Sequence, residues 1–175
     1  PCCPSNISRT WAGLGAYLYS HDSDNIWLHQ YVNSEAEFEN VKLKVETGLP
    51  WRGSVRIKVD PPEKQKLNLH IRVPSWTSGL VAQLNGMPIE TPDTITTTTQ
   101  TASGYDPRRS QFWQLKREWS PGDVIEIEFN MDIQLHRAHP KVKGHDGKAA
   151  LSLGPLVYCL ENIDNPDIDI FSAQI

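Results

Sequence analysis

The feature that most constrains the fold of this 175-residue chain is an alternation of apolar and polar residues with a period of two. It recurs in three runs, at 41–46, 55–60 and 67–73. Successive side chains of a β-strand point to opposite faces, so this period predicts strands with one dry face and one wet face. Antiparallel sheets that cover a core on one side have this pattern. The runs therefore predict a β-rich domain.

Turn signals predict further strands and their connections. Asn85-Gly86 lies inside the segment 80–90 and favours a type I′ hairpin turn between two short strands. The stretch 91–109 is polar and rich in threonine, so we expect a long loop there. The remaining strands are predicted at 112–119 and 124–131, paired through the turn 120–123, and at 149–153 and 156–160, joined through Gly154-Pro155.

A helical pattern precedes the strands. Apolar residues recur at helical spacing between residues 5 and 19, and Ser5 or Asn6 can cap the helix. Many strands after one helix predict a mainly β fold, an antiparallel β-sandwich preceded by one N-terminal helix. We expect the helix within residues 1–20, the sandwich at 21–135, and closing strands or the start of a second sandwich at 136–175.

Composition excludes several classes of function. The net charge is −4 with acids and bases interspersed, which gives no reason to expect nucleic acid as a partner. No run of about 18 apolar residues occurs, so we expect no membrane-spanning helix. The three cysteines are an odd, sparse set, which argues against a disulfide framework and slightly favours a cytoplasmic compartment. The chain begins within a motif and without methionine, so we expect a fragment.

The adjacent pair Cys2-Cys3 is the strongest candidate for chemistry. It stands where the predicted helix begins, and the positive end of a helix favours thiolate over thiol. The pair suits zinc ligation, nucleophilic catalysis or both, although no CxxC or HxxxH partner lies nearby. There are two alternatives: the pair is simply two small residues buried where the helix begins, or it is a redox-active dithiol. Cys159 lies in an apolar strand and is expected to be a buried thiol.

The other polar and aromatic residues give weaker signals. The six histidines show no ligand spacing, and no carboxylate pair suits glycosidase chemistry, because Glu126, Glu128 and the glutamates at 35–39 belong to wet faces. Six tryptophans are many for this length, and they either anchor a core or stack on sugar rings. The alternating pattern favours the core for Trp113 and Trp119 and leaves Trp51 open.

Five motifs, in order and across nearly the whole chain, resemble glycoside hydrolase family 127, the β-L-arabinofuranosidases. They are Cys2-Cys3-Pro4-Ser5-Asn6, Ile71-Arg72-Val73-Pro74-Ser75-Trp76, Leu84-Asn85-Gly86, Trp119-Ser120-Pro121-Gly122-Asp123 and the run from Ala150 to Glu161. Members of this family have a catalytic (α/α)6 barrel followed by β-sandwich domains. The resemblance implies that the N-terminal helix is the last helix of such a barrel, and that the missing barrel domain is a partner of this chain.

The resemblance also implies a site and a mechanism. By motif, Cys2 would be the nucleophile and a zinc ligand, and Cys3 a zinc ligand, with a third cysteine and a glutamate from outside this chain. The substrate would be an arabinofuranoside or a related glycan, hydrolysed with retention. We expect the fragment alone to be inactive and to bind zinc weakly. The alternative is a non-catalytic sandwich that contacts carbohydrate or a partner domain.

Overall fold

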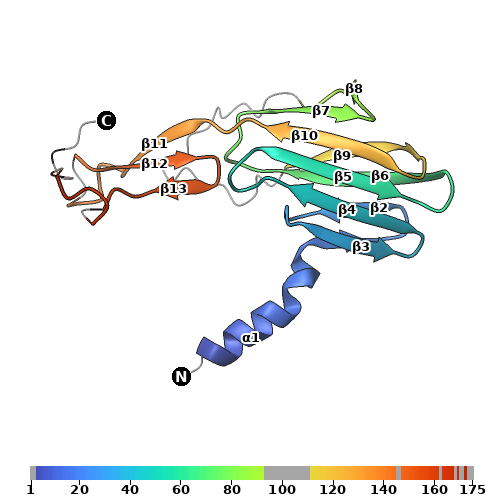
Figure 1. Cartoon of the computed structure of the whole chain (residues 1–175), viewed down its shortest axis with the longest axis horizontal. Helices are drawn as coiled ribbons and strands as arrows, with labels where there is room; N and C mark the ends of the chain where they lie inside the picture. The colour runs from blue at the N-terminus through green and yellow to red at the C-terminus, as the bar shows by residue number, and fades with distance from the viewer. Residues whose placement is uncertain are drawn as a thin grey trace.

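The computed structural model describes residues 3–92, 111–144, 147–161, 163–167, 169 and 172. Within this part, helix α1 (Cys3–Gly13) and the short 3-10 helix η1 (Leu14–Tyr17) precede all strands (Figure 1). The strands are β1 (Tyr19–His21), β2 (Asn25–Leu28), β3 (Ser34–Phe38), β4 (Val41–Thr47), β5 (Ser54–Asp60), β6 (Gln65–Val73), β7 (Leu80–Leu84), β8 (Met87–Pro88), β9 (Gln111–Trp119), β10 (Asp123–Phe129), β11 (Ile133–Arg137), β12 (Ala149–Leu153) and β13 (Leu156–Tyr158).

Two sheets stack to form a β-sandwich, which confirms the predicted fold class (Figure 1). One sheet has the order β1-β2-β6-β9 and the other the order β3-β4-β5-β10-β7-β8. The pairs are antiparallel except β2 with β6, which is parallel. The core lies between the sheets, and its largest fully buried side chains include Trp119, Phe129, Ile57, Leu69 and Ile125.

The period-two runs form the strands that the sequence predicts. In β4 the apolar side chains are buried and the alternating lysine and glutamate side chains are exposed. In β5 and β6 the apolar residues are likewise buried. The hairpin between β7 and β8 is also confirmed, because Asn85 and Gly86 have φ values of 51° and 80°, as a type I′ turn requires. Burial of one strand face therefore drives both local structure and packing.

The prediction that the strands before and after residues 120–123 pair with each other is wrong. Strand β9 pairs with β6, whereas β10 pairs with β5 and β7 in the opposite sheet. The turn is closed by two hydrogen bonds: Asp123 N–H to the Ser120 carbonyl at 3.1 Å, and Ser120 N–H to Asp123 Oδ2 at 2.9 Å. Trp119, the residue before this turn, is fully buried. Because β9 and β10 belong to different sheets, the turn carries the chain across the core.

Several elements differ from the sequence expectations. The helix is shorter than 5–19, because α1 ends at Gly13 and a 3-10 turn follows. Strands β1, β2, β3 and β11 are additional, because each is only three to five residues long and gives a weak signal in the sequence. Of the expected loop at 91–109, residues from 93 onward lie outside the described residues. In the part of the chain that the structure describes, no helix combines the length and apolar character needed to cross a membrane.

A third sheet, with the order β11-β12-β13, follows the sandwich. Figure 1 shows it extending from one end of the two stacked sheets. The turn between β12 and β13 approaches the sandwich closely, because a Cβ at Gly154 would lie 2.8 Å from Met131 Cε and 3.5 Å from Trp76 Cε3. Gln134 Nε2 also donates a hydrogen bond to the Trp76 carbonyl at 3.2 Å. These contacts join the third sheet to the end of the sandwich.

Candidate functional site

Helix α1 carries the part of the cysteine motif that the structure describes. Cys3 is its first residue and has an exposed, free thiol, whereas Cys2 lies outside the described residues. None of the residues of α1 is buried, and Figure 1 shows the helix extending away from the sandwich. The apolar residues Ile7 and Trp11 are 66% and 78% exposed. The helix therefore presents an apolar face that nothing in the described part of this chain covers.

The described residues do not by themselves form a zinc site. No group of three or more histidine, cysteine or acidic side chains is close enough to hold a metal ion within the described ranges. Cys3 can offer one thiol, while a structural zinc site needs four ligands. A metal at the cysteine pair would therefore need Cys2 and ligands from outside the described part.

Cys159 is exposed, so the prediction of a buried thiol is wrong. It follows directly after β13, the edge strand of the three-stranded sheet. Val157 and Tyr158 beside it are 74% and 53% exposed. An apolar run indicates burial only where another layer covers the strand, and no described residue does so here.

Of the histidines, His70 departs from the wet face that its position in β6 predicts. It is only 6% exposed and stacks on Trp27 of β2, with ring centroids 4.6 Å apart. Its Nε2 lies 2.9 Å from Asn25 Oδ1, an acceptor, so the ring donates from Nε2. Burial lowers the pKa of His70, and the nearby Asp22 carboxylate opposes this effect. This cluster cannot be predicted from the sequence, because a contact between side chains on two neighbouring parallel strands leaves no pattern in either strand's own residues.

The remaining histidines form no ligand set within the described residues. His29 bonds Ser20 Oγ through Nε2 at 2.8 Å, and His136 bonds Ser152 Oγ through Nε2 at 2.7 Å. His145 lies outside the described residues.

The tryptophans divide into core and surface groups. Trp113 and Trp119 are 7% and 0% exposed, which confirms the prediction that they anchor the core. Trp119 also donates a hydrogen bond from Nε1 to the Leu67 carbonyl at 3.0 Å. Trp51, by contrast, is 75% exposed on the hairpin between β4 and β5. Large exposed aromatic side chains are typical of recognition surfaces, so this hairpin is a candidate contact site.

The hairpin that carries Trp51 is closed by a set of backbone contacts. The amides of Trp51 and Arg52 both donate to the Gly48 carbonyl, at 3.0 and 2.9 Å. At the other side of the turn, Phe129 N–H donates to the Gly53 carbonyl at 3.0 Å. A Cβ at Gly53 would lie 2.1 Å from the Phe129 carbonyl oxygen, so only glycine fits there. The chain thus holds the backbone beside Trp51 in one conformation.

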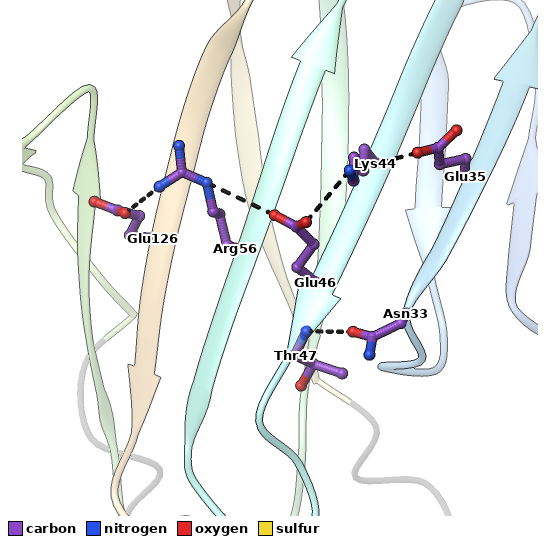
Figure 2. A network of polar contacts seen from close by, with 7 residues as sticks. All are labelled: Asn33, Glu35, Lys44, Glu46, Thr47, Arg56 and Glu126. Carbon is purple, nitrogen blue, oxygen red and sulfur yellow. Dashed lines mark hydrogen bonds and ion pairs between the residues drawn. The ribbon is translucent and has the colours of Figure 1, made fainter.

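The outer face of the six-stranded sheet carries a line of ion pairs across four strands (Figure 2). Arg56 of β5 lies between two carboxylates, with its Nη1 2.6 Å from Glu126 Oε1 and its Nε 4.0 Å from Glu46 Oε2. The line continues from Glu46 to Lys44 at 3.3 Å and from Lys44 to Glu35 at 3.5 Å. The hydrogen bond to Glu46 is the main cause that raises the pKa of Lys44.

Strand register brings these charges together. Arg56 stands directly opposite both Glu46 and Glu126, and Lys44 stands opposite Glu35. The expectation that the glutamates of these strands form wet faces is confirmed for Glu35 and Glu126, which are exposed. That each of these glutamates has an ion-pair partner follows from the strand register, which cannot be read from the sequence.

The same face contains a wide, open hollow of about 1240 Å³. Its lining includes the line of ion pairs, the side chains of Asn33 and Gln83, and the base of the Trp51 hairpin at Thr47, Gly48 and Ser54. Asn33 Oδ1 accepts a hydrogen bond from Thr47 N–H at 2.7 Å (Figure 2). The hollow therefore offers hydrogen-bond donors and acceptors together with apolar surface, to which Val81 and Pro88 contribute.

Two stacked sheets with one shared core place the chain among the β-sandwich proteins. Residues 25–131 match the family profile described as "Beta-L-arabinofuranosidase, GH127 middle domain". Residues 133–175 match the "Glycoside hydrolase family 127 C-terminal domain". The chain therefore belongs to glycoside hydrolase family 127.

Individual relatives agree with this assignment. A non-reducing end β-L-arabinofuranosidase of Bifidobacterium longum subsp. longum is 30% identical over 174 residues, covering 94% of this chain and 24% of the relative. The crystal structure of a GH127 β-L-arabinofuranosidase from Geobacillus stearothermophilus T6 superposes with a TM-score of 0.75 at 34% identity, over 94% of this chain and 24% of that one. A further GH127 β-arabinofuranosidase gives 0.75 at 29% identity, over 93% and 26%. The chain spans about a quarter of the length of these relatives.

Proposed function

We propose that this chain is the C-terminal part of a retaining glycoside hydrolase that acts on β-L-arabinofuranosides or related glycans. The observation that carries the proposal is the match along 94% of the chain to a relative named as a β-L-arabinofuranosidase. The family membership supports the reaction class, and the pair Cys2-Cys3 supplies a candidate nucleophile.

The proposed nucleophile is Cys2. Its thiolate sulfur would form a bond to the anomeric carbon of the sugar while the bond from that carbon to the leaving oxygen breaks. A carboxylic acid from outside this chain would give the leaving oxygen its proton. Water would then give a proton to the resulting carboxylate and attack the same carbon while the bond from that carbon to sulfur breaks, which releases the sugar and restores the thiolate and the carboxylic acid. Two displacements at one carbon explain why we expect retention of configuration.

We further propose that Cys2 and Cys3 bind zinc together with ligands from outside this chain. Zinc, when bound, would keep the coordinating thiols deprotonated near neutral pH. The exposed thiol of Cys3 on the first residue of α1 is compatible with this role, since no described residue blocks it or competes for it. The incomplete set of ligands in the described residues supports the expectation that this chain alone binds zinc weakly.

The exposed apolar face of α1 supports a further domain as its partner. Ile7 and Trp11 of α1 are 66% and 78% exposed, and Leu14, the first residue of η1, is 41% exposed and continues the same spacing. A helix with such a face gains stability by packing it against other elements. The barrel that precedes the sandwich in this family would provide that surface, and the catalytic acid with it.

The test uses the protein that carries this chain together with the residues that its relatives have before it. Hydrolysis of 4-nitrophenyl β-L-arabinofuranoside should be lost in Cys2→Ser and Cys2→Ala, and retained in Cys159→Ser, which also removes an exposed thiol. NMR of the first product should show the β anomer. Hydrolysis by Cys2→Ser, or an inverted first product, would contradict the proposed mechanism.

The zinc proposal has its own measurement. Metal analysis of the same proteins should find zinc in the parent and in Cys159→Ser, and a loss of zinc in Cys2→Ser and in Cys3→Ser. Equal zinc content in all four proteins would show that the cysteine pair is not the metal site. Turnover by the 175-residue chain alone would contradict the expectation that it is inactive.

A further inference from the structure

We propose that the hollow on the outer face of the six-stranded sheet, together with the adjoining Trp51 hairpin, binds a neutral oligosaccharide. The hollow of about 1240 Å³ is open along the sheet and extends to Thr47, Gly48 and Ser54 at the base of that hairpin. Pockets that enclose one small ligand measure about 300–1000 Å³. An open surface of this size, lined by residues of several neighbouring strands, suits a chain of several sugar units better than a single small molecule.

The chemistry of the lining suits sugar hydroxyl groups, each of which both donates and accepts hydrogen bonds. Glu46 is held between Arg56 at 4.0 Å and Lys44 at 3.3 Å, so its carboxylate is oriented before any ligand arrives. A carboxylate has about four acceptor sites and a guanidinium five donors, so these paired groups retain free hydrogen-bonding capacity. The side chains of Asn33 and Gln83 add amide groups to the same lining.

The charge of the lining favours a neutral ligand over an anionic one. Four carboxylates, those of Glu35, Glu46, Glu126 and Glu128, face two cations, those of Lys44 and Arg56. Both cations already have carboxylate partners. A phosphate or a uronic acid would therefore meet excess negative charge and no unpaired cation of the lining.

Trp51 would supply an aromatic surface, since no aromatic side chain is among the described residues that line the hollow. Its side chain is 75% exposed, and the backbone beside it is fixed by the Gly48 and Gly53 contacts. Because the backbone beside it is fixed, only the two side-chain torsions of Trp51 must be ordered when a sugar stacks on its ring. Because residues 48 and 54 of the same hairpin line the hollow, a bound chain of sugars can reach both.

A protein partner fits this face less well. Protein interfaces are depleted of charged residues at their centre, whereas the ion-paired residues of Figure 2 line this hollow. Val81 and Pro88 contribute apolar surface on the side of the hollow formed by β7 and β8. The ligand class rests on the proposed function, but binding here does not require hydrolysis, so the two proposals can fail separately.

The experiment is isothermal titration calorimetry of the full 175-residue chain with neutral oligosaccharides of arabinose, xylose and galactose, and with an oligogalacturonate as the anionic probe. We expect at least one neutral probe to bind and the anionic probe to bind more weakly. Trp51→Ala and Arg56→Ala should each weaken binding by about tenfold, since each removes one aromatic or charged contact.

Two matched variants serve as controls. Trp11→Ala removes a tryptophan of similar exposure on α1, and Lys42→Ala breaks a surface ion pair with Glu37 on the same sheet but outside the hollow. Both should leave the binding constant unchanged. The proposal is overturned if no neutral probe binds, if the anionic probe binds more tightly, or if the controls weaken binding as much as Trp51→Ala and Arg56→Ala do.

Discussion

Trp119 and Trp51 show how differently one residue type is used in this sandwich. Trp119 is fully buried between the sheets and satisfies its only polar group by donating to the Leu67 carbonyl. Trp51 is largely exposed on a closed hairpin. The alternation of polar and apolar residues predicts the first position correctly. It cannot predict the second, because exposure at a hairpin tip depends on how the neighbouring strands end.

At Trp119, replacement by phenylalanine should destabilise the fold clearly. Trp119→Phe leaves a small cavity and removes the hydrogen bond to the Leu67 carbonyl, which together should lower the free energy of unfolding by about 2 kcal/mol. Urea unfolding measures this change. Trp51→Phe is the control and should change the free energy by less than about 0.5 kcal/mol. Equal effects of the two substitutions would contradict the assigned burial.

His70 should make the stability of the sandwich depend on pH. Burial holds the pKa of His70 below 6.5, its ordinary value, so the unfolded chain binds this proton more readily than the folded one. The stabilisation is therefore complete above pH 6.5 and is lost as the pH falls from 6.5 through the folded pKa.

Comparison with His70→Gln isolates this effect from other titrating groups. The difference in unfolding free energy between the parent and His70→Gln should decrease as the pH falls below 6.5, measured by urea unfolding at several pH values. Asp22 titrates in a separate range, because hydrogen bonds, chiefly from Asn25, hold its pKa below 3.8. A difference that does not vary between pH 7 and pH 5 would exclude His70 as the cause.

At the scale of the elements, close backbone approach fixes how strands end and connect. The hairpin between β4 and β5 contacts the end of β10 at Gly53, where any side chain would overlap the Phe129 carbonyl. The turn between β9 and β10 is closed by Ser120 and Asp123 and crosses from one sheet to the other. Such contacts set the topology, although each involves only one or two residues.

A methyl group at Gly53 tests the closeness of this contact. Gly53→Ala should lower the free energy of unfolding by about 3 kcal/mol, because its Cβ would lie 2.1 Å from the Phe129 carbonyl oxygen and backbone must move. Gly13→Ala is the matched control, since no atom lies within 4 Å of a Cβ there, and it should not destabilise the chain. Thermal unfolding of both variants checks the contrast.

The sequence predicted the elements whose burial alternates and missed those whose pairing is remote. Strands β4, β5 and β6 follow from their periodicity, and the β7–β8 turn follows from Asn85-Gly86. Strand β3 is polar and half-buried, so its sequence resembles a loop. The predicted pairing of β9 with β10 is wrong because the residues of the turn 120–123 indicate only that the chain changes direction. They do not determine which sheet the next strand joins.

At the scale of the whole molecule, the described chain has one well-packed part, the sandwich, and two largely exposed parts, helix α1 and the three-stranded sheet. The sandwich contains every residue of the buried hydrophobic core. Helix α1 has no buried residue, and strand β11 of the three-stranded sheet is exposed throughout. The stability of the sandwich should therefore be nearly independent of α1.

Substitution at Trp11 tests this independence. Trp11→Ser should change the free energy of unfolding of the 175-residue chain by less than about 0.5 kcal/mol, because the side chain is 78% exposed. Leu28→Ala, at a fully buried position, should cost about 3 kcal/mol in the same assay. Loss of stability in Trp11→Ser would show that α1 packs on the sandwich.

The candidate site could be predicted only in part. The pair Cys2-Cys3 is a candidate because of its place before a helical pattern, since the chemistry of neighbouring thiols is a local property, and its role stays a prediction. The hollow could not be predicted, because Glu46, Arg56 and Glu126 are ordinary wet-face residues until register places them opposite one another. A pattern of period two gives the face of each side chain but not its neighbour on the next strand.

The order of strands in the sandwich also bears on how the chain assembles. The chain passes from one sheet to the other after β2, β5, β6, β8 and β9, so neither sheet is made from a continuous segment. Strand β10 fills the place between β5 and β7, and its pair Arg56–Glu126 joins residues 70 positions apart. Contacts so distant in sequence make folding slow. During synthesis, β5 and β7 present unpaired edges to other chains until residues 123–129 have left the ribosome.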